Sequence, residues 1–249
     1  MTAEGVYVYA IIRAGRPLPT GAGGVGSPAA PLRTVQQGRL AAVVSEAPPK
    51  LRARRRDLLA HQELLLRLSA EGPVLPMRFG MVAPDEETVR GRLAVDEADH
   101  IAALERLSDG VEINVKALPA QNALADLVAE DKKVRRLRDE ARRRPGYEAS
   151  LRLGEAVATA LQSRAAAAGR RILRELTPLA RAVAPGPDVQ GCVLNVSFLV
   201  GRGDSNDFHR VAERFADKHR THVELRLAGP LPCYSFVSAE ATHARTAGA

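Results

Sequence analysis

The feature that most constrains the fold of this chain is a long stretch of helical periodicity between residues 120 and 184. From Tyr147 to Val183, apolar side chains recur three or four positions apart for about ten turns, which predicts one long helix. A shorter run with a seven-residue apolar repeat precedes it, and an Arg-Pro-Gly break at residues 144–146 separates the two. The two runs predict an αα-hairpin joined along apolar seams, with a bend at Pro178 in the second helix.

Strands are predicted on the N-terminal side of this hairpin. Residues 6–12 are β-branched and aromatic without a helical period, which predicts a buried strand. Residues 32–35 and 40–45 flank a turn at Gly38, a pattern typical of a β-hairpin. Residues 74–82, V-L-P-M-R-F-G-M-V, also have the apolar, β-branched ends of a strand.

Helices are predicted between and after these strands. Asp57 is expected to cap a helix that Gly72-Pro73 ends. A second helical stretch runs from residue 84 to residue 107, with acidic residues in its first turn and a break near residues 94–96.

The C-terminal part alternates between strands and helices. Residues 111–117, 192–200 and 221–227 predict strands, and the last two flank a short helix. Residues 234–237 predict a final edge strand after a Gly-Pro turn, and the tail from about residue 239 is expected to be frayed. This order suggests a ferredoxin-like sheet with helices on one face.

Together these elements predict an α+β chain of two domains. Residues 1–109 are expected to form an N-terminal α+β sheet domain. Residues 110–249 are expected to form a ferredoxin-like domain that contains the helical hairpin at about 120–184.

Composition narrows the class of protein. Apolar residues make up 45% of the 249 residues, but aromatic residues only 4%, so the core must be built mainly from Leu, Val and Ala. No apolar run is long enough to span a bilayer, and no signal-peptide pattern is present, so a cytoplasmic protein is expected. Two cysteines, Cys192 and Cys233, are expected to be reduced thiols.

The positive charge is concentrated in the second part of the chain. Residues 1–109 hold 14 basic and 13 acidic side chains, whereas residues 110–249 hold 22 and 16. Within residues 130–144 there are eight basic and four acidic side chains. Salt-bridged or solvated helix faces account for such a pattern, but a basic nucleic-acid-binding protein is the alternative interpretation. Residues 130–144 contain no aromatic residue for base stacking.

The motifs associated with enzymes and cofactors are incomplete. Residues 21–26 match G-x-G-x-x-G, but they do not directly follow a strand, and Ser27-Pro28 makes a helix start unfavourable. His209, His219 and His222 are close in sequence but fall on a helix and a strand that do not converge. We therefore expect no catalytic residues, cofactor, metal or small-molecule substrate.

Four stretches, taken in order, carry a family resemblance. They are V-Y-V-Y-A-I (6–11), V-L-P-M-R-F-G (74–80), V-E-I-N-V-K (111–116) and G-P-L-P-C-Y-S-F-V (229–237). With the Arg- and Ala-rich helical region between them, the chain resembles the gas vesicle accessory proteins of the F/L family over nearly its whole length. The tail departs from the family pattern, because Leu231 replaces an aromatic residue and Cys233 replaces a proline.

The resemblance implies a function without catalysis. Proteins of this family are accessory components of gas vesicles, with a second domain of modified ferredoxin-like fold. It implies a cytoplasmic or vesicle-associated protein that acts in vesicle nucleation or assembly. Its expected partners are the main hydrophobic shell protein and other gas vesicle accessory proteins, with no membrane involved.

Four residues in the family stretches are candidates for partner binding: Arg78, Phe79, Tyr234 and Phe236. Two roles are open for Arg78. Either it pairs with an acid of its own domain, such as one of residues 85–87, or it marks a surface for a partner protein.

Overall fold

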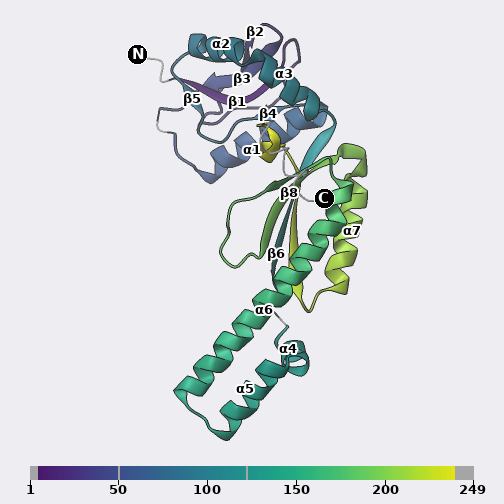
Figure 1. Ribbon diagram of the computed structural model, residues 1–249. Helices are drawn as coiled ribbons and strands as arrows, with labels where there is room; N and C mark the ends of the chain where they lie inside the picture. Colours follow the sequence, from purple (N-terminus) through teal and green to yellow (C-terminus); the bar gives the residue numbers. More distant parts are fainter. Residues whose placement is uncertain (1–4, 50, 122, 239–249) are drawn as a thin grey trace. The chain divides into compact units, whose positions relative to one another are not determined.

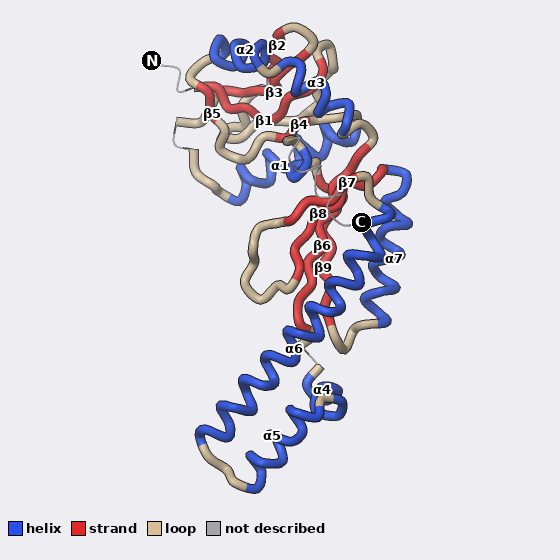
Figure 2. The backbone as a smooth tube through the Cα atoms, in the orientation of Figure 1, coloured by secondary structure: helices blue, strands red, loops and turns tan. Residues whose placement is uncertain are grey.

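The computed structural model describes residues 5–49, 51–121 and 123–238, and its fold is α+β, as the sequence predicts (Figures 1 and 2). The chain divides into two compact units. The first unit combines residues 1–112 with residues 230–249, and the second contains residues 113–229. The predicted fraying of residues 239–249 concerns a segment outside the described residues.

The sheet of the first unit has β1 (Val6–Arg13) at its centre. One side of β1 pairs antiparallel with β3 (Leu40–Glu46), and β3 pairs with β2 (Arg33–Gln37), which confirms the predicted hairpin. The other side of β1 pairs with two very short strands, β4 (Leu75–Pro76) and β5 (Val82–Ala83). The single strand expected over residues 74–82 is therefore interrupted in the middle.

A β-bulge in β1 decides which side chains reach each face of this sheet. The pairing with β3 runs from Val8↔Val44 directly to Ala10↔Val43, so Tyr9 is the extra residue. The bulge keeps Tyr7, Tyr9 and Ala10 in one buried cluster with α1, although strict alternation would place Ala10 on the opposite face.

Among the described residues of the first unit there are three α-helices: α1 (Arg55–Glu71), α2 (Glu86–Val95) and α3 (Glu97–Arg106). Leucines of α1 pack on the face of the sheet that carries the tyrosines. The predicted helix break at residues 94–96 is confirmed, because α2 ends at Val95, α3 begins at Glu97 and Asp96 lies between them. Asp85 caps α2, since its carboxylate accepts a 2.7 Å hydrogen bond from the Thr88 backbone N–H.

The predicted cap of α1 is wrong. The helix begins at Arg55, so Asp57 lies inside its first turn and is buried. Its carboxylate accepts a 3.0 Å hydrogen bond from the backbone N–H of Gly26 instead. A contact with a distant loop has therefore replaced the local capping interaction.

The sheet of the second unit has the strand order β7-β8-β6-β9, which is the order of a ferredoxin-like fold. Its strands are β6 (Gly110–Pro119), β7 (Ala182–Pro185), β8 (Leu194–Gly201) and β9 (Val223–Leu231). Helix α7 (Ser205–Lys218) connects β8 to β9 and buries two phenylalanines. Figure 1 shows α6 and α7 beside one another along this sheet.

Three expectations for the C-terminal part are corrected. The long helix ends at Leu176, and Pro178 lies in the 3-10 turn that follows it rather than at a bend. The expected Gly-Pro turn at residues 229–230 is part of β9. The expected last strand is a 3-10 turn, η3 (Tyr234–Phe236).

The predicted helical hairpin is confirmed, with α4 (Leu124–Glu130) leading into it. It consists of α5 (Lys132–Arg143) and α6 (Tyr147–Leu176). The C-terminal half of α6 packs on the sheet through small residues, among them Gly169, whose position lies close to side chains of residues 117, 193 and 194. The N-terminal half of α6 packs on α4 and α5 and forms a small core with them.

Candidate functional site

Residues 77–81 form a projecting loop, which we call the arch, between β4 and β5. Its two ends are fixed to the same edge of β1. The Met77 N–H donates to the Tyr9 carbonyl at 2.8 Å, and the Val8 N–H donates to the Met81 carbonyl at 2.9 Å. Gly80 has φ of 92°, a left-handed conformation that glycine adopts without strain. The V-L-P-M-R-F-G-M-V stretch therefore encodes two short strands and a loop of fixed ends.

A buried chain of hydrogen bonds holds the arch from below. The Gly80 N–H donates to the Tyr7 hydroxyl at 3.0 Å, and that hydroxyl lies 3.0 Å from Nδ1 of His61. Nε2 of His61 lies 3.1 Å from the Met77 carbonyl. Because a carbonyl only accepts, Nε2 carries the imidazole proton, and Nδ1 accepts the proton of Tyr7. One tyrosine and one histidine thus fix both sides of the arch.

Burial keeps this chain of hydrogen bonds neutral. Desolvation lowers the pKa of His61 and raises that of Tyr7. The ring of Phe79 lies edge-on to both, with centroid distances of 5.9 Å to Tyr7 and 5.7 Å to His61. His61, which has no recognisable motif around it in the sequence, therefore has a structural role at this site.

The glycine-rich loop at residues 21–26 belongs to the same cluster and has no helix after it until Arg55. The Val25 N–H donates to the Tyr9 hydroxyl at 2.7 Å, and that hydroxyl bonds to Ser45 at 2.9 Å. A Cβ atom at Gly24 would lie 2.5 Å from the Tyr9 hydroxyl. The glycines allow the loop to approach Tyr9 closely, which explains their presence without a nucleotide.

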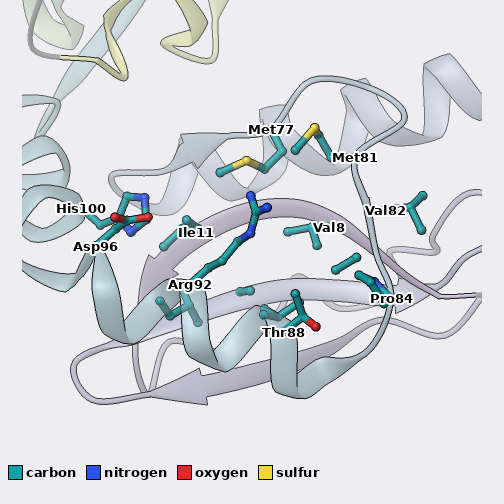
Figure 3. A pocket seen from close by; sticks show the side chains of 14 residues that line it. Val8, Ile11, Met77, Met81, Val82, Pro84, Thr88, Arg92, Asp96 and His100 are labelled. Atoms are coloured by element: carbon teal, nitrogen blue, oxygen red, sulfur yellow. The ribbon is translucent and has the colours of Figure 1, made fainter.

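An apolar depression, which we call the groove, lies on the opposite face of β1 from the tyrosines (Figure 3). It has a volume of about 250 Å³. Met81 and Val82 at its border are each 44% exposed, although both are apolar. Strand β1, the arch and helix α2 supply the apolar walls, through Val8, Ile11, Met77, Met81, Val82, Val89 and Leu93.

A single cation projects into this apolar groove. Figure 3 shows the Arg92 side chain extending from α2 toward Met77 and Val8. Among the described residues, the Arg92 guanidinium forms no ion pair or hydrogen bond. At one end of the groove lie Asp96 and His100, and Nδ1 of His100 is buried without a partner among the described residues. The site is therefore suited to an apolar group that carries a carboxylate.

The arch itself presents Arg78 to solvent. The acid pair expected for Arg78 is wrong, because the carboxylates of residues 85–87 are engaged elsewhere. Asp85 bonds to Thr88, and Glu86 pairs with Arg33 and Arg90 at 2.9 and 2.8 Å. Among the described residues, no acid pairs with Arg78. A second uncompensated cation thus stands beside the groove.

Tyr234 and Phe236 lie in the turn η3 near the other end of the chain. Tyr234 is 39% exposed, whereas Phe236 is buried. The turn is fixed by Glu112, whose carboxylate accepts from the N–H and hydroxyl of Ser235 at 2.8 and 2.7 Å. Burial and the charge of Glu112 raise the pKa of Tyr234 to about 12. Of the four candidate residues, two share the arch and two share this turn. Phe79 and Phe236 face the interior.

The three clustered histidines have different surroundings. His209 Nδ1 lies 2.8 Å from the Ser205 carbonyl, and the rings of His219 and His222 lie 6.0 Å apart. Within the described part of the chain, no group of three or more His, Cys, Asp or Glu side chains could hold a metal ion. Among the described helices, none combines the length and apolar character that a bilayer-spanning segment requires.

The fold and the sequence define the class of this protein. Residues 5–238 match the family described as "Gas vesicle synthesis protein GvpL/GvpF", and the chain belongs to this family. The family is a structural and assembly family of gas vesicles and is not known as enzymatic.

Two relatives match the chain over most of its length. The chain is 43% identical over 235 residues to gas vesicle protein F of Streptomyces sp. (strain CB03234), which covers 93% of this chain and 98% of that protein. It is 33% identical over 258 residues to gas vesicle protein L of the same organism, covering 92% and 91%.

Two solved structures share the fold. The crystal structure of the gas vesicle protein GvpF from Anabaena sp. PCC7120 matches with a TM-score of 0.75 at 24% identity, covering 94% of this chain and 98% of that chain. GvpF from Microcystis aeruginosa matches with a TM-score of 0.71 at 20% identity, covering 94% and 99%.

Proposed function

We propose that this protein acts in gas vesicle nucleation or assembly by binding the main hydrophobic shell protein, and that the arch and the groove form the docking surface. Family membership supports an accessory role in gas vesicles. The observation that carries the finer proposal is the groove, an exposed apolar site with one uncompensated cation inside it.

The shape and chemistry of the groove favour an apolar protein segment as its ligand. Met77 and Met81 line it on the arch side. Methionine side chains are unbranched and flexible, so they adapt to different apolar partners. A volume of about 250 Å³ suits one or two large side chains of a bound helix or strand. An aggregation-prone shell protein needs such a cover before it is assembled.

The two arginines, Arg92 and Arg78, favour a ligand that carries negative charge. Arg92 in the groove and Arg78 on the arch form no ion pair among the described residues. Bringing an apolar segment over Arg92 removes water from the guanidinium, which is unfavourable unless a carboxylate replaces the water. The favoured ligand is therefore an apolar segment flanked by an acidic residue.

The other aspects of the function follow from this role. The protein works in the cytoplasm or at the vesicle, and other gas vesicle accessory proteins are its further partners. Tyr234 is the exposed member of the second candidate pair, and Phe236 and Phe79 support the surface from inside.

The test is co-expression with the main shell protein followed by pull-down. The double variant Met81→Asp/Val82→Asp places charges on the apolar border and is expected to reduce the retained shell protein roughly tenfold or more. The matched control is Leu58→Asp/Leu59→Asp on α1, where the side chains are 41% and 53% exposed and lie outside the groove.

A second pair of variants tests the charge. Arg92→Glu is expected to reduce binding, and Arg55→Glu, an exposed residue at the start of α1, is expected to leave it unchanged. The proposal fails if the unmodified chain retains no shell protein and its deletion leaves vesicle formation intact. Equal losses in the groove variants and their controls would exclude the groove as the docking surface.

A further inference from the structure

The helical hairpin of the second unit has one face committed to its own core. Leu127 and Val134 are buried there against Ala156 of α6. This core is small, and the faces of α5 and α6 that point away from it are exposed. The side chains on those exposed faces are not needed for the packing of the hairpin.

Most of the positive side chains at residues 132–144 form no ion pair with the described residues. Eight cations lie between residues 132 and 144, and among the described residues only Arg138 has an ion pair, with Asp139 at 2.9 Å. Arg135 and Arg143 donate to backbone carbonyls instead. Like charges three or four residues apart destabilise a helix by about 0.2–0.5 kcal/mol per pair. The free hairpin therefore carries a repulsion that an acidic partner would relieve.

Exposed apolar side chains lie where this charge is densest, at the end of the hairpin. Tyr147 is 83% exposed and Leu151 is 50% exposed, and they stand one turn apart on α6. Arg142, Arg143 and Arg144 precede Tyr147 by three to five residues and are also exposed. We call these five residues the hairpin tip. Tyrosine and arginine are enriched among the residues that dominate protein–protein binding energies.

We propose that the hairpin tip is a docking surface for an acidic amphipathic helix of another protein, in which carboxylates flank an apolar side chain. The carboxylates meet the three arginines, which bind them in bidentate fashion, and the apolar side chain packs on Tyr147 and Leu151. This surface is separate from the groove and does not depend on the shell-binding proposal.

The surroundings of the tip favour a protein over a nucleic acid. Three acids, Asp139, Glu140 and Glu148, lie among the cations and would repel a continuous line of phosphates. Tyr147 is the one aromatic residue in the hairpin, whereas single-stranded nucleic acids are bound by successive stacking platforms.

The test measures fluorescence anisotropy of a labelled synthetic helix of about 20 residues, with glutamates on one face and leucines on the other. The full chain is titrated in about 150 mM salt, where the Debye length is about 8 Å. The variant Arg142→Glu/Arg143→Glu/Arg144→Glu is expected to weaken binding at least about tenfold. Tyr147→Ser is expected to weaken it about threefold or more without a change of charge.

The control reverses the same number of charges on the other helix of the hairpin, α6. Arg170→Glu/Arg171→Glu/Arg174→Glu alters exposed cations about 35 Å from Tyr147 along α6 and is expected to change binding less than about twofold. Equal losses in both triple variants, or no effect of Tyr147→Ser, would overturn the proposal. So would tighter binding of a single-stranded oligonucleotide that displaces the peptide.

The same variants separate this proposal from the function proposed above. The tip variants are expected to retain the main shell protein in the pull-down, and Met81→Asp/Val82→Asp is expected to bind the acidic peptide normally. Loss of shell-protein binding in the tip variants would show that the tip is not a separate site.

Discussion

The arch of the first unit and the hairpin of the second both present exposed side chains, but they are stabilised in opposite ways. The arch has almost no regular structure, and buried side chains far away in the sequence hold its backbone through Tyr7 and His61. The hairpin is regular throughout and is held by its own helical hydrogen bonds and a small aliphatic core. A surface can thus be fixed from outside its own segment or from within it.

The difference has a consequence for mutation. Damage to the arch is expected from substitutions in the core of the first unit, because its shape depends on that core. The hairpin is expected to lose structure locally, since its core is shared by three consecutive helices and little else.

The largest expected difference in stability is between two tyrosine-to-alanine substitutions, one below the arch and one on the hairpin. Tyr7→Ala removes a fully buried ring and two hydrogen bonds and is expected to cost about 3–5 kcal/mol of unfolding free energy. Tyr147→Ala removes a ring that is 83% exposed and is expected to change stability by less than about 0.5 kcal/mol. Urea unfolding followed by circular dichroism measures both. A similar loss for both tyrosines would contradict the comparison.

A smaller and local effect is expected for Leu127→Ala, which opens a cavity in the hairpin core. The expected loss is about 2–4 kcal/mol, confined to residues 124–161. Hydrogen exchange read by mass spectrometry should show faster exchange in α4, α5 and the first half of α6, with strand β1 unchanged. Faster exchange in β1 would show that the hairpin is not an independent packing unit.

The smallest effect is expected from pH. The pKa of His61 is lowered in the folded state by burial, so the unfolded chain binds its proton first as the pH falls. Stability from this residue is complete above the ordinary histidine pKa, near 6.5, and declines as the pH falls below it. His61→Gln is expected to flatten the decline between about pH 7.5 and pH 5, measured by thermal unfolding. An unchanged slope would mean that His61 is not the titrating group.

The parts of this structure that depend on local periodicity could be predicted from the sequence. The helical hairpin, the β2–β3 hairpin and the break between α2 and α3 are all found where the sequence places them. The end of α6 is wrongly predicted, because Val183 continues the apolar spacing of the helix although the chain changes to β7 after Pro178. The domain boundary near residue 109 stays a prediction.

The candidate site depends on residues that come together only in the folded chain. The groove needs Val8, Met81 and Arg92 at one place, and no spacing in the sequence indicates their convergence. An ion pair with an acid of residues 85–87 is one of the two roles open for Arg78, but Arg33, a residue far upstream, reaches Glu86 instead. The partner-binding roles of Arg78, Phe79, Tyr234 and Phe236 stay predictions. The one signal in the sequence for this site is the pair of methionines, Met77 and Met81, on either side of Arg78 in an apolar stretch.

The bulge at Tyr9 reverses which alternate side chains of β1 face α1. Before the extra residue, odd-numbered positions face α1, and after it, even-numbered positions do. The strand can therefore supply tyrosines to the support of the arch and Val8 and Ile11 to the wall of the groove within a few residues. Deleting one residue at the bulge would exchange interior and groove side chains along half of the strand. The number of residues in β1 therefore decides which side chains line the groove, the proposed binding surface.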